Sequence, residues 1–515
     1  MRFIKKSPPV PMSVPPRQFR IAFAGLLLVL TLAALDQNIV TTALPQIVAD
    51  LGGLERLAWV VTAFMLTSTI SAPLYGKLSD LYGRRPMFVI SIVLFLAGSV
   101  LCGIAHDMLE LIVYRGVEGL GAGGLITLTQ IAVADLVGGL GRAKYQGFFT
   151  GVFALCSIAG PLLGGILTET LSWRWIFYVN IPFGIAAMIL ILMGIPHMPR
   201  HAHPRIDYSG AVLLTIGTTT LLLVLSWAGT AYAWLSPQVL GLAGVTVVVF
   251  AAFGLNEHRH AEPLLPLRLF AGKVFRVGVS TNALSQVGMF SAMLFMPLYF
   301  QVRFGAGPTV AGLMLTPLMA GVVVASMLGG RLVVATGRIK GLTVWGLGLS
   351  AVALGALTAV AWLQAGALVF EAVLVVVGVG LGAAMPNLTT VIQNGVAQRD
   401  LGVATSANAL FRSIGGAFGV ALAGALVNMV LLAHLGNGAS HALQAGGAAG
   451  NESLARVLSP SAIGAYEAAV VVTFLSGAVV LAIACLQCIF LPDDRIVTTG
   501  AGLQVEPPAA PPRQM

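Results

Sequence analysis

Fourteen apolar segments, each close to the length needed to cross a lipid bilayer, limit the fold of this 515-residue chain more than any other feature of its sequence. An α-helix of about 20 apolar residues crosses the hydrocarbon core of a membrane, and only 9% of the residues here are charged. Because backbone polar groups in lipid must be hydrogen-bonded within the protein, we expect each segment to be a helix. The sequence therefore predicts an all-α polytopic membrane protein, with spans near residues 20–44, 57–75, 87–105, 109–131, 147–168, 176–195, 208–228, 236–254, 276–300, 308–331, 342–363, 367–391, 405–433 and 468–491.

The basic residues predict the orientation of these spans. When the 28 lysines and arginines are assigned to alternate sides of the membrane, 22 fall on the side of the two termini. Four lie on the other side, namely Arg56, Arg174, Arg303 and Arg456. The remaining two, Arg115 and Arg412, lie within spans. Since cytoplasmic loops are enriched in Lys and Arg, we expect a multi-pass protein of the cytoplasmic (inner) membrane with both termini in the cytoplasm. The net charge of +9 is spread between spans rather than gathered on one face, so no nucleic-acid partner is expected.

An internal repeat predicts how the fourteen helices are grouped. Three short motifs, which begin at Gly76, Gly119 and Ser157, recur after 254, 261 and 256 residues. Internal repeats of this kind indicate paired structural units in membrane proteins, so we expect two homologous six-helix bundles and two inserted helices. The expected divisions are a disordered cytoplasmic tail at 1–19, an N-terminal bundle at 20–195, a linker with the inserted helices at 196–275, a C-terminal bundle at 276–491 with an outer loop at 434–467, and a second disordered tail at 492–515.

The segment from Gly76 to Pro86 contains four charges and two glycines between two apolar spans. Charged residues are expensive in hydrocarbon, and glycine lets the backbone turn sharply. We therefore expect a short cytoplasmic loop over these residues, with turns at Gly76 and Gly83.

Asp80 in this segment has no acidic counterpart in the second half of the chain, where Val334 occupies the equivalent position. A carboxylate is stabilised by the unpaired N–H groups at the start of a helix, and the thirteenth helix is expected to start near 401–406. We therefore hypothesise a latch in which Asp80 contacts that helix and stabilises the outward-open state. Arg84 or Arg85 is expected to hold Asp80 in place and to reach the carboxylate of Asp135.

Three ionisable residues lie at similar depth within the first and fourth spans. Asp36 is about sixteen residues into its helix, and Arg115 and Glu118 are three residues apart, which places them on one helix face. Ionised side chains in hydrocarbon are costly, so these three are expected to face the bundle interior and pair. A proton-coupling group and a fixed ion pair that holds the two helices together both fit this pattern.

Several motifs resemble those of the major facilitator superfamily, in particular its fourteen-helix drug:proton antiporter branch. The order G-K-L-S-D-x-x-G-R-R at residues 76–85 resembles the signature loop between transmembrane helices 2 and 3. The segments 35–45, 115–123 and 173–182 are similar to the branch's helix-1, helix-4 and outer-loop motifs. A set of small residues in the fifth span resembles its exporter motif, namely Gly147, Gly160, Pro161, Gly164 and Gly165.

The resemblance implies the major facilitator fold, alternating access, and a proton gradient as the energy source with no cofactor. It also implies proton-coupling roles for Asp36, Arg115 and Glu118. The chain departs from the pattern at Glu118, where Gln is commoner, and at Cys156, where Gly is usual. Whether Glu118 titrates or is a tolerated substitution is open at this point.

Aromatic, methionine and amide side chains in the spans are candidates for the lining of a substrate cavity, namely Gln37, Trp59, Phe64, Met289, Phe290 and Met293. Arg412, about two turns into its helix, is expected to extend toward the cytoplasmic surface. The histidines of the cytoplasmic loops are interpreted as solvated linker residues rather than metal ligands, and no metal site is expected. No constellation of nucleophile, base or metal ligands points to an enzyme.

Together these features predict proton-coupled efflux of amphipathic organic compounds or drugs, with the protein working as a monomer in the bilayer. A lipid exporter of the same fold and a proton-independent carrier are the alternatives. The need for a periplasmic adaptor, the identity and charge of the substrate, and the proton stoichiometry are left open by the sequence.

Overall fold

The computed structural model describes residues 15–53, 56–139, 141–196, 207–229, 232–260, 262–448 and 460–492. Within these residues, fourteen helical segments are long and apolar enough to cross a membrane, which confirms the predicted all-α membrane fold. Most of the two predicted tails lies outside the described part, although the first helix already begins at Pro16.

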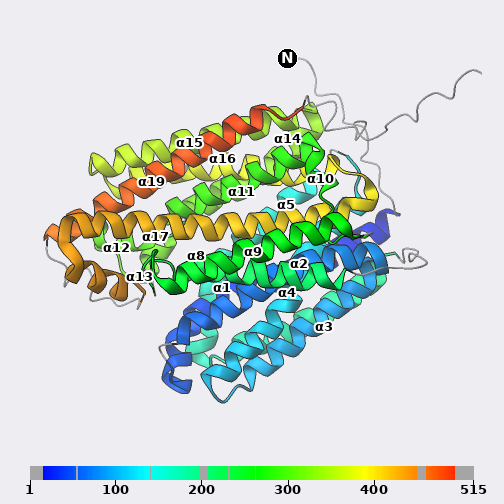
Figure 1. Ribbon diagram of the computed structural model, residues 1–515, viewed down its shortest axis with the longest axis horizontal. Helices are drawn as coiled ribbons and strands as arrows, with labels where there is room; N and C mark the ends of the chain where they lie inside the picture. Colours follow the sequence, from blue (N-terminus) through cyan, green and yellow to red (C-terminus); the bar gives the residue numbers. More distant parts are fainter. Residues whose placement is uncertain are drawn as a thin grey trace, which may run out of the picture.

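The first six spans form one group of packed helices, drawn in blue and cyan in Figure 1. They are α1 (Pro16–Leu51), α2 (Leu57–Tyr82), α3 (Arg84–Gly103), α4 (Met108–Leu136), α5 (Gly141–Thr170) and a broken span of α6 (Trp175–Tyr178) and α7 (Asn180–Gly194). Two inserted helices follow, α8 (Tyr208–Trp227) and α9 (Pro237–Arg259), and α8 contacts both α2 and the long helix α17 of the second group.

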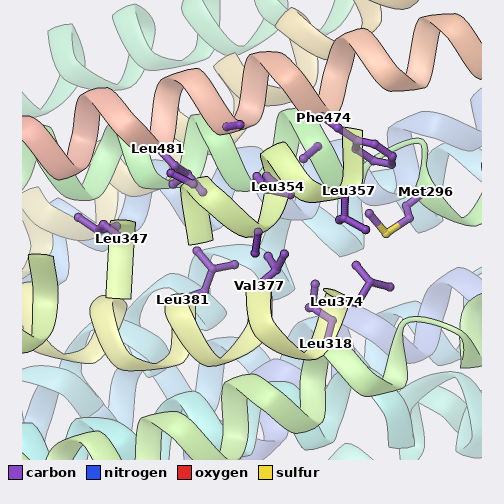
Figure 2. Packing of buried hydrophobic residues seen from close by; sticks show 14 of the residues in the cluster. Met296, Leu318, Leu347, Leu354, Leu357, Leu374, Val377, Leu381, Phe474 and Leu481 are labelled. Atoms are coloured by element: carbon purple, nitrogen blue, oxygen red, sulfur yellow. The ribbon is translucent and has the colours of Figure 1, made fainter. Parts of the chain in front are cut away.

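The last six spans form the second group, drawn from green to red in Figure 1. Two of these spans consist of two pieces each, α11 (Lys273–Met293) with α12 (Met296–Phe304), and α13 (Pro308–Leu313) with α14 (Thr316–Thr336). The other four are α15 (Ile339–Trp362), α16 (Ala367–Asn394), α17 (Leu401–Ala448) and α19 (Pro460–Ile489). The short α10 (Arg268–Ala271) precedes α11, and the 3₁₀ turn η2 (Gln398–Asp400) precedes α17. Figure 2 shows the apolar core of this group, where Leu354 and Leu357 of α15 and Leu374, Val377 and Leu381 of α16 meet Phe474 and Leu481 of α19.

Proline explains where three spans are interrupted. Pro182, Pro297 and Pro317 each lie in the first turn of the second piece, in α7, α12 and α14. A proline has no N–H to donate and clashes with the preceding turn, so it favours a helix start, although Pro45, Pro73, Pro161 and Pro386 lie within continuous helices.

The turn between α2 and α3 is much tighter than predicted. The expected loop over 76–86 is wrong, because α2 continues to Tyr82 and α3 begins at Arg84, which leaves Gly83 as the one residue between them. Gly83 has φ of 91°, a conformation that glycine adopts without a steric penalty. The polar side chains of this segment therefore project from the last turns of α2 and the first turn of α3. We call the end of the molecule that contains Gly83 the hairpin end, and the opposite one the far end.

The predicted outer loop at 434–467 is also largely helical. α17 continues to Ala448 and α19 begins at Pro460, while 449–459 lies outside the described residues. The sequence from 434 to 448 has four glycines but no proline, so every residue in it can donate the backbone N–H that a continuing helix needs. The expectation of a loop or loose hairpin is therefore wrong for the described parts of this stretch.

Candidate functional site

Arg115 lies at the centre of a buried polar cluster between α1 and α4. Its Nη1 donates to Asp36 Oδ2 at 2.8 Å and to Glu118 Oε2 at 2.7 Å. All three side chains are at most 1% exposed. The structure thus brings together the three residues that the sequence placed at one depth, and two carboxylates share one guanidinium nitrogen.

Other side chains complete this cluster from α3, α6 and α7. Asn180 Nδ2 donates to Asp36 Oδ1 at 3.2 Å and to Ser99 Oγ at 2.9 Å, and the Ser99 hydroxyl donates to the carbonyl of Phe177 at 2.9 Å. The Cys102 thiol lies 3.6 Å from Glu118 Oε2. Asn180 lies within one of the sequence motifs, but neither it nor Ser99 was expected in the site, because neither is charged.

Two polar atoms in the cluster have no hydrogen-bond partner among the described residues. They are Glu118 Oε1 and Arg115 Nε. The Arg115 guanidinium lies over the ring of Phe64, 4.1 Å from its centroid, which partly compensates for the lost hydration of the cation. A free carboxyl oxygen beside a shared cation gives this cluster a position that can accept a proton.

A second cluster joins the two helix groups at the hairpin end. Asp80 Oδ2 accepts from the backbone N–H of Val403, the third residue of α17, at 3.1 Å. Arg84 donates to Asp80 at 2.5 Å and to Asp135 at 2.8 Å, and Gln398 donates to the other oxygen of Asp135 at 2.7 Å. The structure therefore has the contact geometry that the latch hypothesis requires, with Arg84 making these contacts and Arg85 having contacts of its own.

Gly76 allows the close approach of α2 and α17 in this cluster. A Cβ on Gly76 would lie 2.8 Å from the carbonyl oxygen of Gly402 and closer still to the side chain of Ser406. Its role is thus helix contact rather than the turn that we expected, which Gly83 makes alone.

Arg142, at the start of α5, forms a further connection between the groups that the sequence did not reveal. It is buried and donates to the carbonyls of Ala134 and Val137 at the end of α4. It also donates to the Gln393 carbonyl at 3.0 Å and to Asn394 Oδ1 at 2.9 Å at the end of α16. Because an arginine in a loop at this end is already explained by the orientation rule, nothing in the sequence marked it.

The glycines of the exporter motif in α5 divide between two neighbours. A Cβ on Gly147 would lie 2.3 Å from the carbonyl oxygen of Ser326 in α14, so Gly147 packs across the two groups. Gly160 and Gly164 pack on Asn38 and Ile39 of α1 instead. Gly165 has open space around it, and Pro161 lies within the helix.

The candidate cavity residues lie in different surroundings. Phe64 is buried beneath Arg115 and has little exposed surface in this conformation, so its place in a substrate cavity stays a prediction. Trp59 packs on Trp227 of α8, and Met289 and Met293 contact the apolar core of the second group. Phe290 packs on α17 and Gln37 is half-buried on α1.

An apolar cavity of about 580 Å³ lies elsewhere, between α2, α3 and α4. It is lined by residues that include Leu78, Met87 and Leu94, with Tyr75 and Tyr82. Ile90, another lining residue, is exposed on the outer surface, so the cavity opens toward the surrounding membrane rather than between the two helix groups.

Comparison with known proteins relates this architecture to a family. Residues 26–420 match the model of the Major Facilitator Superfamily. The multidrug transporter protein MdtP of Bacillus subtilis is 38% identical over 79% of this chain and 75% of its own length, and multidrug resistance protein 3 of the same organism is 32% identical over 92% and 95%. The crystal structure of the human organic anion transporter MFSD10 shares the fold, with a TM-score of 0.64 at 15% identity over 92% of this chain and all of that one. The chain belongs to the Major Facilitator Superfamily, as its motifs had suggested.

Proposed function

We propose that this protein exports amphipathic organic compounds across the cytoplasmic membrane in exchange for protons, by alternating access of a site between its two six-helix groups. The similarity to multidrug transporters supports the direction and the broad class of substrate. The distribution of basic residues supports a cytoplasmic location for the hairpin end. With that orientation, the contacts of Asp80, Arg84 and Arg142 join the two helix groups on the cytoplasmic side, as expected of an outward-facing state.

The buried cluster of Asp36, Arg115 and Glu118 is the observation on which proton coupling rests. One cation is shared by two carboxylates, so the cluster has one negative charge in excess unless a proton is bound. A proton on one carboxyl group leaves Arg115 paired with the other alone. Since Asp36 is also bound to Asn180 at the break in the sixth span, protonation changes contacts on α1, α4 and α7 together.

Asp36→Asn is therefore expected to abolish efflux driven by a proton gradient while the protein still folds and inserts. Efflux of a panel of cationic, neutral and anionic compounds is measured from inside-loaded proteoliposomes, with and without an imposed gradient. Asp50 is an exposed carboxylate near the C-terminal end of the same helix, so Asp50→Asn serves as the control and should retain coupled efflux. Full gradient-dependent efflux by Asp36→Asn would exclude the proton-carrier role, and gradient-independent efflux by the wild type would indicate a proton-independent carrier.

A lipid-like substrate is the second candidate, and the apolar cavity between α2, α3 and α4 favours it because this cavity opens toward the membrane. The same proteoliposome assay separates the two candidates. A lipid exporter would move a fluorescent phospholipid between leaflets, and water-soluble amphipathic compounds would not compete with it.

Asp80→Asn is expected to weaken closure of the cytoplasmic side. A carboxylate at a helix start contributes about 0.3–2 kcal/mol, enough to shift a balanced two-state equilibrium several-fold. Thr405→Cys, buried in the closed interface, reports the opening through its rate of thiol labelling in a background that lacks the four native cysteines. We expect labelling to rise several-fold with Asp80→Asn and to stay unchanged with Asp50→Asn. Equal labelling in all three proteins would mean that the contact between Asp80 and α17 has no role in closure.

A further inference from the structure

Arg412 is a cation without a counter-charge inside the membrane-spanning part of α17. It lies eleven residues after Leu401, the first residue of the helix, which corresponds to about 16 Å at 1.5 Å per residue. No described residue gives its guanidinium a hydrogen bond or an ion pair, whereas Arg115 has two carboxylates and Arg142 has several carbonyl groups. Because an unpaired charge at this depth is costly, Arg412 requires either water or an anion beside it.

The periodicity of α17 places Arg412 on the inner face of the helix. Asn408, one turn earlier, accepts a hydrogen bond from Asn282 of α11 at 2.8 Å. Thr405, two turns earlier, accepts from Gln393 of α16 at 3.2 Å. Residues four and seven apart share one helix face, so Arg412 lies on the face that meets the interior helices and not on the lipid-facing side.

The space beyond Thr405 is closed toward the hairpin end. The Gln393 amide that donates to Thr405 also donates to the carbonyl of Gln130 on α4 at 3.3 Å. These hydrogen bonds form a layer that joins the two helix groups between Arg412 and the hairpin end. The Arg412 side chain was expected to extend toward the cytoplasm, and this layer lies across that route. Arg412 is nevertheless partly exposed, so its side chain is not enclosed by the surrounding helices.

Gln286 of α11 lies at the same level. α11 and α17 both begin at the hairpin end, and Gln286 and Arg412 are each four residues beyond the bonded pair of Asn282 and Asn408. The side-chain oxygen of Gln286 is buried and has no partner among the described residues. The oxygen and nitrogen of an amide are interchangeable by a flip, so this group can also offer an N–H to a ligand.

An apolar surface continues from this point toward the far end. Phe290, one turn after Gln286, packs against Gly416 and Gly419 of α17. A compound bound here would have its charged group at Arg412 and its apolar body beside Phe290.

We propose that Arg412 binds the acidic group of the exported compound, so that the substrates of this transporter are amphipathic carboxylates. A planar guanidinium matches a carboxylate in a bidentate arrangement and remains charged at any physiological pH. The inference deepens the proposed efflux function, and as a statement about export it rests on that function. It also separates the two charges of the transport cycle, with the proton in the first helix group and the acid in the second. The position equivalent to Arg412 in the first half, 256 residues earlier, is Cys156, so the cation is not a repeated structural feature.

Binding of a matched pair of probes tests this assignment. The probes are 1-pyrenebutyrate and its primary amide, which differ in charge at neutral pH, titrated by fluorescence onto the full-length protein in nanodiscs with empty nanodiscs as blank. Hydrogen bonds to charged groups predict that the wild type binds the acid about 10- to 100-fold more tightly than the amide. Arg412→Gln should remove that preference while it leaves the affinity for the amide unchanged, and Arg412→Lys should retain part of it.

Arg331→Gln, the same change at an exposed arginine of α14, is the control and should bind both probes as the wild type does. The proposal is overturned if the wild type has no preference for the acid or fails to bind it. It is also overturned if Arg412→Gln loses affinity for both probes equally, because a purely structural role would produce that result. No gradient is present in this titration, so its failure is distinguishable from a failure of proton-coupled efflux.

Discussion

Replacement of Arg115 with alanine is expected to abolish transport and to destabilise the protein by about 3–5 kcal/mol, the usual cost of removing one partner from a buried ion pair. Asp36 and Glu118 would then face each other as two buried carboxylates without a cation, and Phe64 would lose the guanidinium that lies over its ring. The measurements are unfolding by denaturant in detergent and coupled efflux from proteoliposomes.

Arg268→Ala is the control for this experiment. Arg268 also forms an ion pair, with Asp400 at 2.8 Å, but 56% of its side chain is exposed, so its removal should cost about 1 kcal/mol or less. The triple variant Arg115→Ala, Asp36→Asn, Glu118→Gln should recover much of the lost stability, since no uncompensated charge is left, but it should not recover transport. If Arg115→Ala proves as stable as Arg268→Ala, the cluster is not the buried network described here.

The residues of the buried cluster could be predicted because charge in an apolar helix leaves few alternatives. Asp36, Arg115 and Glu118 had to face inward and pair, whatever the remaining helices did. Asn180 and Ser99 could not be predicted in the same way. Neutral polar side chains occur on any face of a membrane helix, where they can bond to the preceding turn, as Thr31 does to the carbonyl of Leu27.

The contacts at the hairpin end were only partly predictable, because they depend on how two separate helix groups meet. Asp80 was expected to contact α17 since its charge is absent from the second half. The turn at Gly83 was predicted too long, because a run of charges suggests a loop, although the last turns of α2 and the first turn of α3 carry these side chains. Arg142 gave no signal, since a basic residue at this end is what the orientation of the chain already requires.

Two opposite charges now account for closure at the hairpin end. Asp80 accepts from the N–H of Val403 at the start of α17, where the helix dipole is positive. Arg142 contacts the carbonyl groups at the ends of α4 and α16, where it is negative. Both contacts need α2 and α5 to approach the second helix group closely, and glycines provide the room.

Gly147→Ala is therefore expected to hold the protein open on the cytoplasmic side and to reduce efflux strongly. The new methyl group would lie 2.3 Å from the carbonyl oxygen of Ser326, a backbone atom that cannot rotate away, and the Ser326 hydroxyl donates to the Gly147 carbonyl at 3.1 Å. Overpacking of this kind costs about 1–3 kcal/mol, which corresponds to a shift of about five- to 150-fold in the ratio of open to closed protein. Thiol labelling at Thr405→Cys should increase by a similar factor, while unfolding of the separate helix groups should be unaffected because the strain lies between them.

Gly151→Ala provides the matched control on the same helix. Gly151 is one turn further along α5 and faces the same helix α14, but a Cβ there would meet Val323 Cγ1 at 3.8 Å, an ordinary van der Waals contact. We expect this variant to label and transport like the wild type. If Gly147→Ala also leaves labelling unchanged, α5 and α14 separate by some other route, and the contact between them at the hairpin end does not limit the proposed transport cycle. If both variants open the protein equally, the cause is a change in α5 itself rather than its contact with Ser326.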